Sequence, residues 1–168
     1  THAHFSQEGN TRILTLDPVT IEFNGLTVKL QTKEYFEEGS SKIKIERNIL
    51  EMSDPDAEVT IDEYMVACYG TTEYPEDMTS VVLKCEGADE KTIHYAYKCR
   101  GEVLAGATAV SAVVPPIDTK VSLTASSTDA EGYIEEGYAF SPMFKLGYKK
   151  TITDKEVFAT WLNLEKAN

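Results

Sequence analysis

The segment from Val19 to Leu30, which has the sequence VTIEFNGLTVKL, decides the fold class of this 168-residue chain. Its central Asn24-Gly25 pair supplies the two positive φ positions of a type I′ turn, whose twist matches the strands that it joins. Apolar and polar residues alternate on both sides of the turn, so folding it places Phe23 opposite Leu26 and all the apolar side chains on one face. The segment therefore predicts a half-buried antiparallel hairpin.

Alternation of the same kind continues through most of the chain. From Ser41 to Arg47, Ile43 and Ile45 occupy one face of an expected strand. The charged side chains of its other face are Lys42, Lys44 and Glu46. Further strands are expected at about 81–85, 93–97, 102–114 and 119–125, between turn residues. The pattern predicts a mainly β protein, an antiparallel β-sandwich or barrel.

Two segments carry signals of a helix. Thr60 with Glu63, and Thr153 with Glu156, have the spacing of a capping box, in which two side chains satisfy free amide groups at a helix start. An apolar stripe at helical spacing follows each box. The stripes are Ile61, Tyr64, Met65 and Cys68 in the first segment, and Val157, Phe158, Trp161, Leu162 and Leu164 in the second. We expect a short internal helix ending near Gly70 and a C-terminal amphipathic helix at about 153–166, although residues 59–63 also alternate like a strand.

The rest of the chain has a simple organisation. Residues 1–10 are polar and are expected to form a flexible N-terminal arm, with residues 11–168 forming a single β-rich domain that ends in the helix. Residues 31–41 are polar and charged and are predicted to form a long loop. Residues 133–148 show no decisive pattern, and their role stays open. No apolar stretch approaches the roughly 20 residues needed to span a bilayer, so a membrane role is not expected.

The charge balance disfavours one class of partner. The formal net charge is −12, from 28 acidic and 16 basic residues. Such a surface repels the phosphates of nucleic acids, so DNA or RNA binding through a basic surface is not expected. Solubility is the simpler explanation of the charge. The alternative is a surface that lies near DNA without adhering to it, or that meets a basic partner.

Three cysteines, Cys68, Cys85 and Cys99, bear on redox state and location. An odd number leaves one thiol unpaired in a secreted protein. A simple hairpin turning near residues 88–89 would place Cys85 opposite Thr92 and Cys99 opposite Met78, so those two cysteines would not meet. Reduced thiols are therefore favoured over a disulfide framework, which stays an open alternative. A virion or another particle assembled in the cytoplasm is accordingly favoured over secretion.

The sequence contains no motif for catalysis, cofactors or metals. Nucleophile elbow, phosphate-binding loop and Cys-x-x-Cys spacing are all missing, and His94 stands alone in an expected strand. Asp54, Asp56 and Glu58 alternate like the start of a calcium loop, but the glycine and the distal glutamate of an EF-hand are missing. The sequence thus predicts no catalytic, cofactor-binding or metal-binding residue, and leaves calcium binding by the acidic loops open.

The expected order of elements is hairpin, long charged loop, strand, short helix and several more strands. From Val19 to Ala125 this order resembles the tail-tube proteins of bacteriophages, whose β-sandwich subunits close into rings around a channel. The resemblance implies a non-enzymatic structural subunit of a self-assembling particle, of virion or tail-tube type, whose partner is a second copy or another protein. The candidate interface residues are Glu34, Tyr35, Phe36, Glu37, Glu38 and Trp161.

Two other functions stay open. The nine tyrosines and the long polar loops are compatible with a secreted or surface β-sandwich that binds a protein or glycan, because tyrosine combines rigid apolar area with a polar tip. The many acidic residues are compatible with a carboxylate-based hydrolase, but their spacing does not say which carboxylates converge across a cleft.

Overall fold

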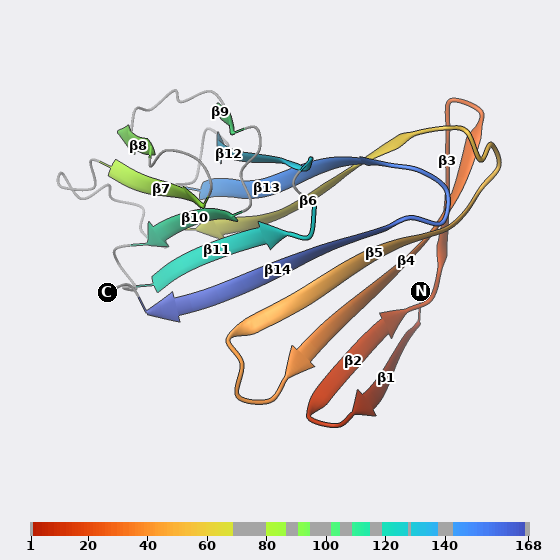
Figure 1. The fold of residues 1–168 in the computed structure, drawn as a ribbon, viewed down its shortest axis with the longest axis horizontal. Helices are drawn as coiled ribbons and strands as arrows, with labels where there is room; N and C mark the ends of the chain where they lie inside the picture. The colour runs from red at the N-terminus through yellow and green to blue at the C-terminus, as the bar shows by residue number, and fades with distance from the viewer. Residues whose placement is uncertain are drawn as a thin grey trace.

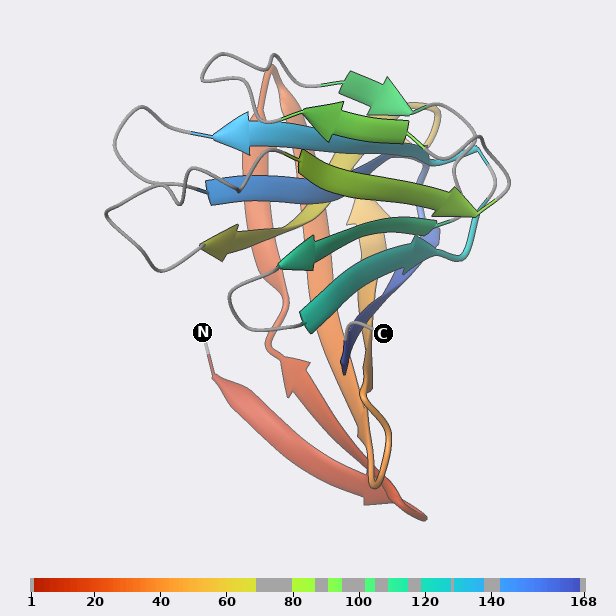
Figure 2. The ribbon, with the colours of Figure 1, turned by 90° about the vertical axis from the view of Figure 1, so that its left-hand side faces the viewer.

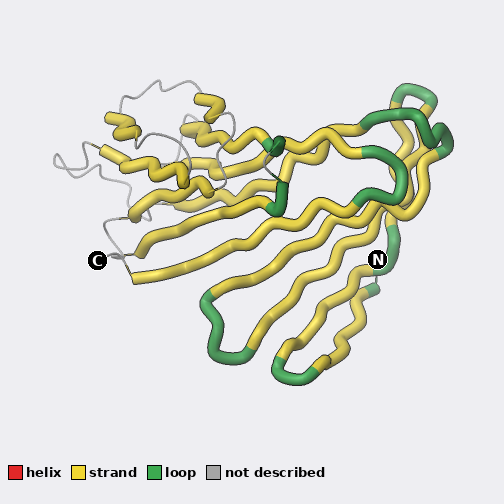
Figure 3. Tube along the Cα trace, in the orientation of Figure 1, coloured by secondary structure: helices red, strands yellow, loops and turns green. Residues whose placement is uncertain are grey.

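The computed structural model describes residues 2–68, 80–86, 91–94, 102–104, 109–114, 119–127, 129–137 and 143–166. These residues form fourteen strands in two antiparallel sheets that pack as a sandwich (Figure 1). They include no helix, as the tube of Figure 3 shows, and hence no helix long and apolar enough to cross a membrane. The mainly β, sandwich part of the prediction is therefore confirmed.

The larger sheet has ten strands in the order β1-β2-β4-β5-β14-β11-β10-β7-β8, and β3 pairs with the first half of β4. Their bounds are β1 Ala3–Glu8, β2 Thr11–Leu16, β3 Val19–Phe23, β4 Leu26–Glu37, β5 Lys42–Met52, β7 Ser80–Glu86, β8 Lys91–His94, β10 Ala109–Val114, β11 Thr119–Ala125 and β14 Val157–Lys166. The smaller sheet has the order β6-β13-β12-β9. Its strands are β6 Val59–Cys68, β9 Glu102–Leu104, β12 Glu131–Gly137 and β13 Met143–Ile152.

The core lies between the two sheets. Its buried residues come from both layers, with Val28, Ile49 and Phe158 on the larger sheet and Tyr148 and Ile152 on the smaller. Burial of such side chains supplies the main driving force for packing the layers together. Strands β1 and β2 lie away from the smaller sheet, at the bottom of Figure 2 in red, so this side of the larger sheet extends beyond the sandwich.

The predicted hairpin is confirmed in its register and turn. Strands β3 and β4 pair Val19 with Leu30 and Phe23 with Leu26. Asn24 and Gly25 have φ of 49° and 79°, the two left-handed positions that a type I′ turn requires. The apolar face of the hairpin is only partly buried, because β3 is an edge strand whose apolar side chains stay 37–45% exposed.

Both predicted helices are wrong. The segment with the first capping box is β6, which pairs along its whole length with β13, from Val59 opposite Ile152 to Cys68 opposite Met143. The C-terminal segment is β14, a central strand between β5 and β11. Partners distant in sequence decide here, because a strand that completes its hydrogen bonds on one or two sides and buries alternate residues outweighs a local helical preference.

The loop expected at residues 31–41 is wrong for residues 31–37, and only residues 38–41 connect two strands. Strand β4 continues to Glu37, because its second half pairs with β2 on one side and β5 on the other. The expected strand at 102–114 is divided between β9 in the smaller sheet and β10 in the larger. In the N-terminal ten residues, the chain forms β1, which pairs with β2 from Ala3 opposite Leu16 to Glu8 opposite Thr11.

The hairpin that carries Cys85 differs from the expected register. Strands β7 and β8 pair Val82 with Thr92 and Leu83 with Lys91. Cys85 is therefore not opposite Thr92, as a turn near residues 88–89 would have placed it. Cys85 pairs with Val110 of β10 instead. Cys99 lies outside the described residues.

Candidate functional site

Alternate residues of the larger sheet point away from the smaller sheet, on a surface that we call the outer face. Directly paired residues of antiparallel neighbours point to the same side, so the register places a single row of side chains across five strands. The row consists of Ile13, Tyr35, Lys44, Trp161 and Thr124, from β2, β4, β5, β14 and β11. We call these residues, with Glu46, the aromatic row.

Lys44 lies at the centre of the aromatic row, between two rings. Its Nζ is 4.9 Å from the centroid of the Tyr35 ring and 5.8 Å from that of Trp161. Both distances are within the range of cation–π attraction. The same Nζ is 2.6 Å from Oε1 of Glu46, two residues further along β5 on the same face. The side chains of Lys44 and Glu46 are 34% and 16% exposed, so solvent reaches the pair.

Glu46 also accepts a hydrogen bond from the phenol of Tyr35, at 2.7 Å between Oη and Oε2. Desolvation by itself would raise the pKa of Glu46, but the hydrogen bonds from Lys44 and Tyr35 and the charges of Lys44 and Lys33 hold it below its ordinary value. Desolvation first, and then the Glu46 carboxylate, raise the pKa of Tyr35 to about 12. At neutral pH Glu46 is therefore an ionised acceptor and Tyr35 a protonated donor.

Polar contacts continue beside Trp161. The amide of Asn163, two residues along β14 on the same face, accepts a hydrogen bond from Ser41 at 2.7 Å and donates one to Glu165 at 2.5 Å. Asn163 is only 7% exposed. A buried amide that is bonded at both ends keeps a fixed orientation, so this end of the aromatic row is preorganised.

The predicted interface residues are divided between three places. Tyr35 and Trp161 meet in the aromatic row, which the sequence did not indicate because residues 35 and 161 are far apart in the chain. Glu34 and Phe36 alternate with Tyr35 along β4, on the opposite face. Glu37 ends β4, and Glu38 lies in the turn that follows. An interface made by these residues remains a prediction.

Lys44 and Glu46 were missed as site residues. The alternation of residues 41–47 correctly placed both on the polar face of a strand, but a polar strand face is usually only solvated. The one available signal was the position of a lysine and a glutamate at i and i+2, which puts them on one face of a strand. The aromatic partners come from other strands, and no local pattern in the sequence indicates them.

A second cluster of charges lies inside the sandwich and is structural. The guanidinium of Arg47 on β5 binds both carboxylate oxygens of Glu63 on β6, with distances of 2.5 and 3.0 Å, and donates to Thr32 on β4 at 2.6 Å. Glu63 is 6% exposed. A bidentate pair of this kind satisfies the buried carboxylate of Glu63 and connects a strand of each sheet.

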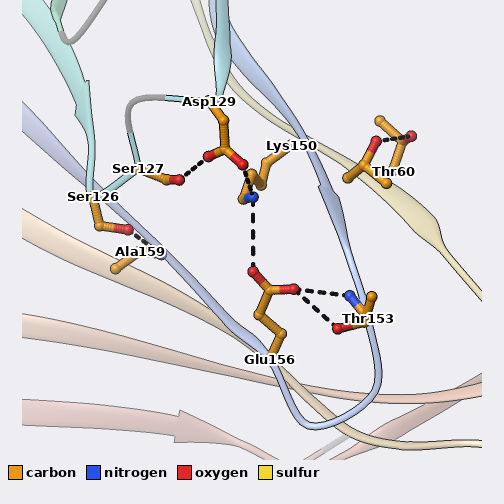
Figure 4. A network of polar contacts seen from close by, with 9 residues as sticks. Thr60, Ser126, Ser127, Asp129, Lys150, Thr153, Glu156 and Ala159 are labelled. Atoms are coloured by element: carbon orange, nitrogen blue, oxygen red, sulfur yellow. Dashed lines mark hydrogen bonds and ion pairs between the residues drawn. The ribbon is translucent and has the colours of Figure 1, made fainter. Parts of the chain in front are cut away.

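A third cluster surrounds the turn between β13 and β14 (Figure 4). Lys150 Nζ lies 2.5 Å from an Asp129 oxygen and 3.8 Å from Glu156, and Ser127 donates to the other oxygen of Asp129. Glu156 accepts hydrogen bonds from the amide and hydroxyl of Thr153, at 2.9 and 3.3 Å. Of the two capping-box bonds predicted, the one from the Thr153 amide to the Glu156 carboxylate occurs, but it closes a turn between strands. Lys155, at φ 59°, completes that turn.

Metal binding finds no support in the described residues, which bring together no group of three or more His, Cys, Asp or Glu side chains suited to hold an ion. Within the same residues, Asp54 and Asp56 form a tight turn, in which the amide of Asp56 donates to the Asp54 carboxylate at 3.0 Å. The Asp54 carboxylate therefore binds a backbone amide of its own turn.

The fold is similar to that of three solved structures. A galactose mutarotase-like protein from Lactobacillus casei ATCC 334 matches with a TM-score of 0.60 and 10% identity, over 97% of this chain and 73% of its own. The Slr1438 protein from Synechocystis sp. PCC 6803 has a TM-score of 0.55 and 9% identity, over 99% of this chain and 66% of its own. A putative aldose 1-epimerase from Escherichia coli K12 has a TM-score of 0.54 and 10% identity, over 99% of this chain and 69% of its own.

No model of a known family and no curated protein matches the sequence. The chain spans about two thirds to three quarters of the length of the three structures. At identities near 10% the similarity establishes the fold alone.

These comparisons correct the functional prediction. The resemblance to tail-tube proteins is wrong, because the fold is similar to that of a galactose mutarotase-like protein and a putative aldose 1-epimerase. The predicted function as a non-enzymatic structural subunit rested on that resemblance and is therefore wrong as well. The expectation that the protein is not an enzyme is overturned as well, since two of the structures that share the fold carry the names of enzyme classes.

Proposed function

We propose that this protein binds an aldose at the aromatic row and interconverts its two anomers by acid–base catalysis. The proposal draws its substrate class from the names of the two solved structures, a galactose mutarotase-like protein and a putative aldose 1-epimerase. The chemistry is argued from the side chains of the aromatic row. The two lines are independent, because the fold alone does not specify a site.

The observation that carries the proposal is the pairing of Lys44 and Glu46. An ammonium donor and a carboxylate acceptor lie 2.6 Å apart on a face that solvent reaches. In a cyclic aldose, the ring oxygen and the anomeric hydroxyl are attached to the same carbon. A donor and an acceptor side by side therefore match two neighbouring oxygens, of which one must gain a proton while the other loses one.

The reaction balances with these two groups. Glu46 removes the proton of the anomeric hydroxyl while Lys44 protonates the ring oxygen, and the bond from the anomeric carbon to the ring oxygen breaks. The product is the open-chain aldehyde, whose carbonyl group rotates about the neighbouring carbon–carbon bond. Closure on the other face of the carbonyl returns the proton from Glu46 to the new anomeric hydroxyl, and the ring-forming hydroxyl returns its proton to Lys44.

Tyr35 and Trp161 supply the binding surface. Their rings flank Lys44, and aromatic rings offer flat apolar area against which the C–H face of a sugar packs. The phenol of Tyr35 keeps the carboxylate of Glu46 oriented through their 2.7 Å hydrogen bond. Since the pKa of Glu46 is held below its ordinary value, the acceptor is ionised throughout the neutral range.

Exchange spectroscopy by NMR tests the proposal, with galactose and glucose as probes. We expect the full chain to accelerate exchange between the α and β anomers, and Glu46→Gln to lower kcat/KM by about 100-fold or more, a typical loss for removal of a general base. Glu34→Gln is the matched control, because Glu34 is on the opposite face of the sheet, beside Tyr35 in sequence. Its rate should equal that of the wild type.

Trp161→Ala separates binding from chemistry, with an expected rise in KM larger than any fall in kcat. The proposal is overturned if the wild-type protein does not accelerate exchange of either sugar. It is also overturned if Glu46→Gln and Glu34→Gln have the same rate.

A further inference from the structure

A pocket of about 310 Å³ lies at one end of the larger sheet, where two hairpin turns meet. It is lined by Gln7, Asn10, Arg12, Phe36, Glu37 and Glu38. These residues come from the β1–β2 hairpin and from the end of β4, whose turns lie side by side at the lower end of the molecule in Figure 1. The volume is at the lower limit for small-molecule sites, and so suits a ligand of about one sugar ring.

Backbone contacts hold the walls of this pocket in place. The amide of Glu38 donates to the carbonyl of Asn10 at 2.9 Å and joins the two turns. Each turn carries a glycine in the left-handed region, Gly9 at φ 58° and Gly39 at φ 81°, where other residues are strained. Gln7 is fixed by a hydrogen bond from its side-chain amide to the carbonyl of Gly9, at 3.0 Å. The pocket is therefore preformed.

The charged groups of the pocket are free to bind. Within the described residues, the guanidinium of Arg12 and the carboxylates of Glu37 and Glu38 have no hydrogen-bond or ion-pair partner. They line the same pocket as the half-buried Phe36. The pocket thus offers donors and acceptors around an apolar surface.

This combination selects among ligand classes. Two carboxylates against one guanidinium repel an anion. A hydrocarbon would strip water from three charged groups without replacing its hydrogen bonds. A neutral polyol satisfies both kinds of group, because each hydroxyl donates and accepts, and its C–H face packs on the ring of Phe36.

We propose that the pocket is a second saccharide site, separate from the aromatic row. Arg12 pairs with Phe36, whereas Ile13 pairs with Tyr35, so Phe36 and Tyr35 point to opposite faces of the sheet. The residues of the aromatic row do not line the pocket, so a ligand in the pocket does not occupy that row. The inference does not depend on catalysis at Glu46.

Saturation-transfer NMR and calorimetry on the full chain test this site, with galactose, glucose, maltose and lactose as probes. We expect Phe36→Ala and Arg12→Ala each to weaken one binding event at least tenfold, and Trp161→Ala to leave that event unchanged. Phe5→Ala is the control, since Phe5 is an aromatic residue of β1 that is 74% exposed and does not line the pocket. Arg12 is exposed, so its variant tests the site even where Phe36→Ala fails to fold.

Two results overturn the proposal. One is binding of all four sugars to Phe36→Ala and Arg12→Ala with wild-type affinity. The other is binding of putrescine at the pocket with no binding of sugars, which would assign an organic cation to the two carboxylates. Failure of anomer exchange leaves this experiment unaffected, so the two proposals fail separately.

Discussion

The two faces of strands β4, β5 and β14 differ although they alternate along the same backbone. On the inner face, Val28, Ile49 and Phe158 are at most 4% exposed and pack between the sheets. On the outer face, the side chains of the aromatic row other than Ile13 are half-buried, and they include a lysine between two rings with a glutamate beside it. The inner face supplies stability, and the outer face is free to carry chemistry because the core does not depend on it.

The largest expected effect compares two aromatic residues of β14. Phe158→Ala should lower the free energy of unfolding by about 3–5 kcal/mol, because it empties a fully buried position. Trp161→Ala should cost less, about 1–2 kcal/mol, because its side chain is partly exposed on the outer face. Urea denaturation measures both. Equal losses for the two variants would contradict the difference between the faces.

A single charge on the inner face gives the next effect. Glu63→Ala leaves the guanidinium of Arg47 without its carboxylate, and should cost about 3 kcal/mol, the lower end for a buried pair because the Arg47 side chain is 28% exposed. Glu51→Ala, at an exposed position of β5, is the control with little effect. Replacing both partners, Arg47→Met with Glu63→Leu, should recover most of the loss. No recovery would mean that the pair itself holds the sheets together.

A glycine on the smaller sheet extends the comparison between faces, because the ring of an aromatic residue covers this position of the sheet. A Cβ added at Gly147 would lie 2.6 Å from ring atoms of Tyr133, whose hydroxyl donates to Asp62 at 2.5 Å. Gly147→Ala should therefore displace the ring and cost about 1–3 kcal/mol in a thermal or urea unfolding experiment. In a Tyr133→Ala background the same substitution should cost much less. An equal cost in both backgrounds would exclude the ring as the cause.

The smallest effects are the pH dependences of the aromatic row. The pKa of Tyr35 is raised to about 12 in the folded protein, first by desolvation and then by Glu46. A group whose folded pKa is raised adds stability that is complete below its ordinary pKa near 10 and is lost as the pH rises toward 12. Ultraviolet titration of the wild type minus Tyr35→Phe should show this phenol ionising later than free tyrosine. Ionisation at the ordinary pKa would contradict the contact between Tyr35 and Glu46.

The pH dependence of stability that Glu46 contributes has the opposite sign. Its folded pKa is lowered, so its contribution is present above the ordinary pKa of a glutamate and is lost as the pH falls through the folded value. The stability difference between wild type and Glu46→Gln should accordingly shrink in acid. A difference that does not change with pH would show that Lys44 and Tyr35 do not favour the charged carboxylate.

Local signals predicted the parts of the fold that local chemistry controls. The Asn24-Gly25 turn and the strand register around it are confirmed, as is the strand that begins at Lys42. The capping boxes show the limit of such signals. The bond from the Thr153 amide to the Glu156 carboxylate forms as expected, but within a turn between strands, because side chain to backbone bonds over three residues do not require a helix.

The aromatic row could not be predicted in the same way. Tyr35 was selected from an expected loop and Trp161 from an expected helix, and both assignments of structure were wrong. Only the pairing of β4, β5 and β14 brings their rings to the two sides of Lys44. A periodic pattern states which residues share a face of one strand, but it carries no information about which strand lies next to it.

The sequence by itself determined that this chain is an antiparallel β protein with a negative charge and a hairpin at Asn24-Gly25, because turn chemistry and alternation act within a few residues. The tertiary structure alone decided that residues 59–68 and 157–166 are strands. It also decided that Tyr35, Lys44 and Trp161 form one row, and that Arg47 meets Glu63 between the sheets. Those outcomes depend on hydrogen bonds and burial between segments far apart in the chain, whose free energy exceeds the local preferences of each segment.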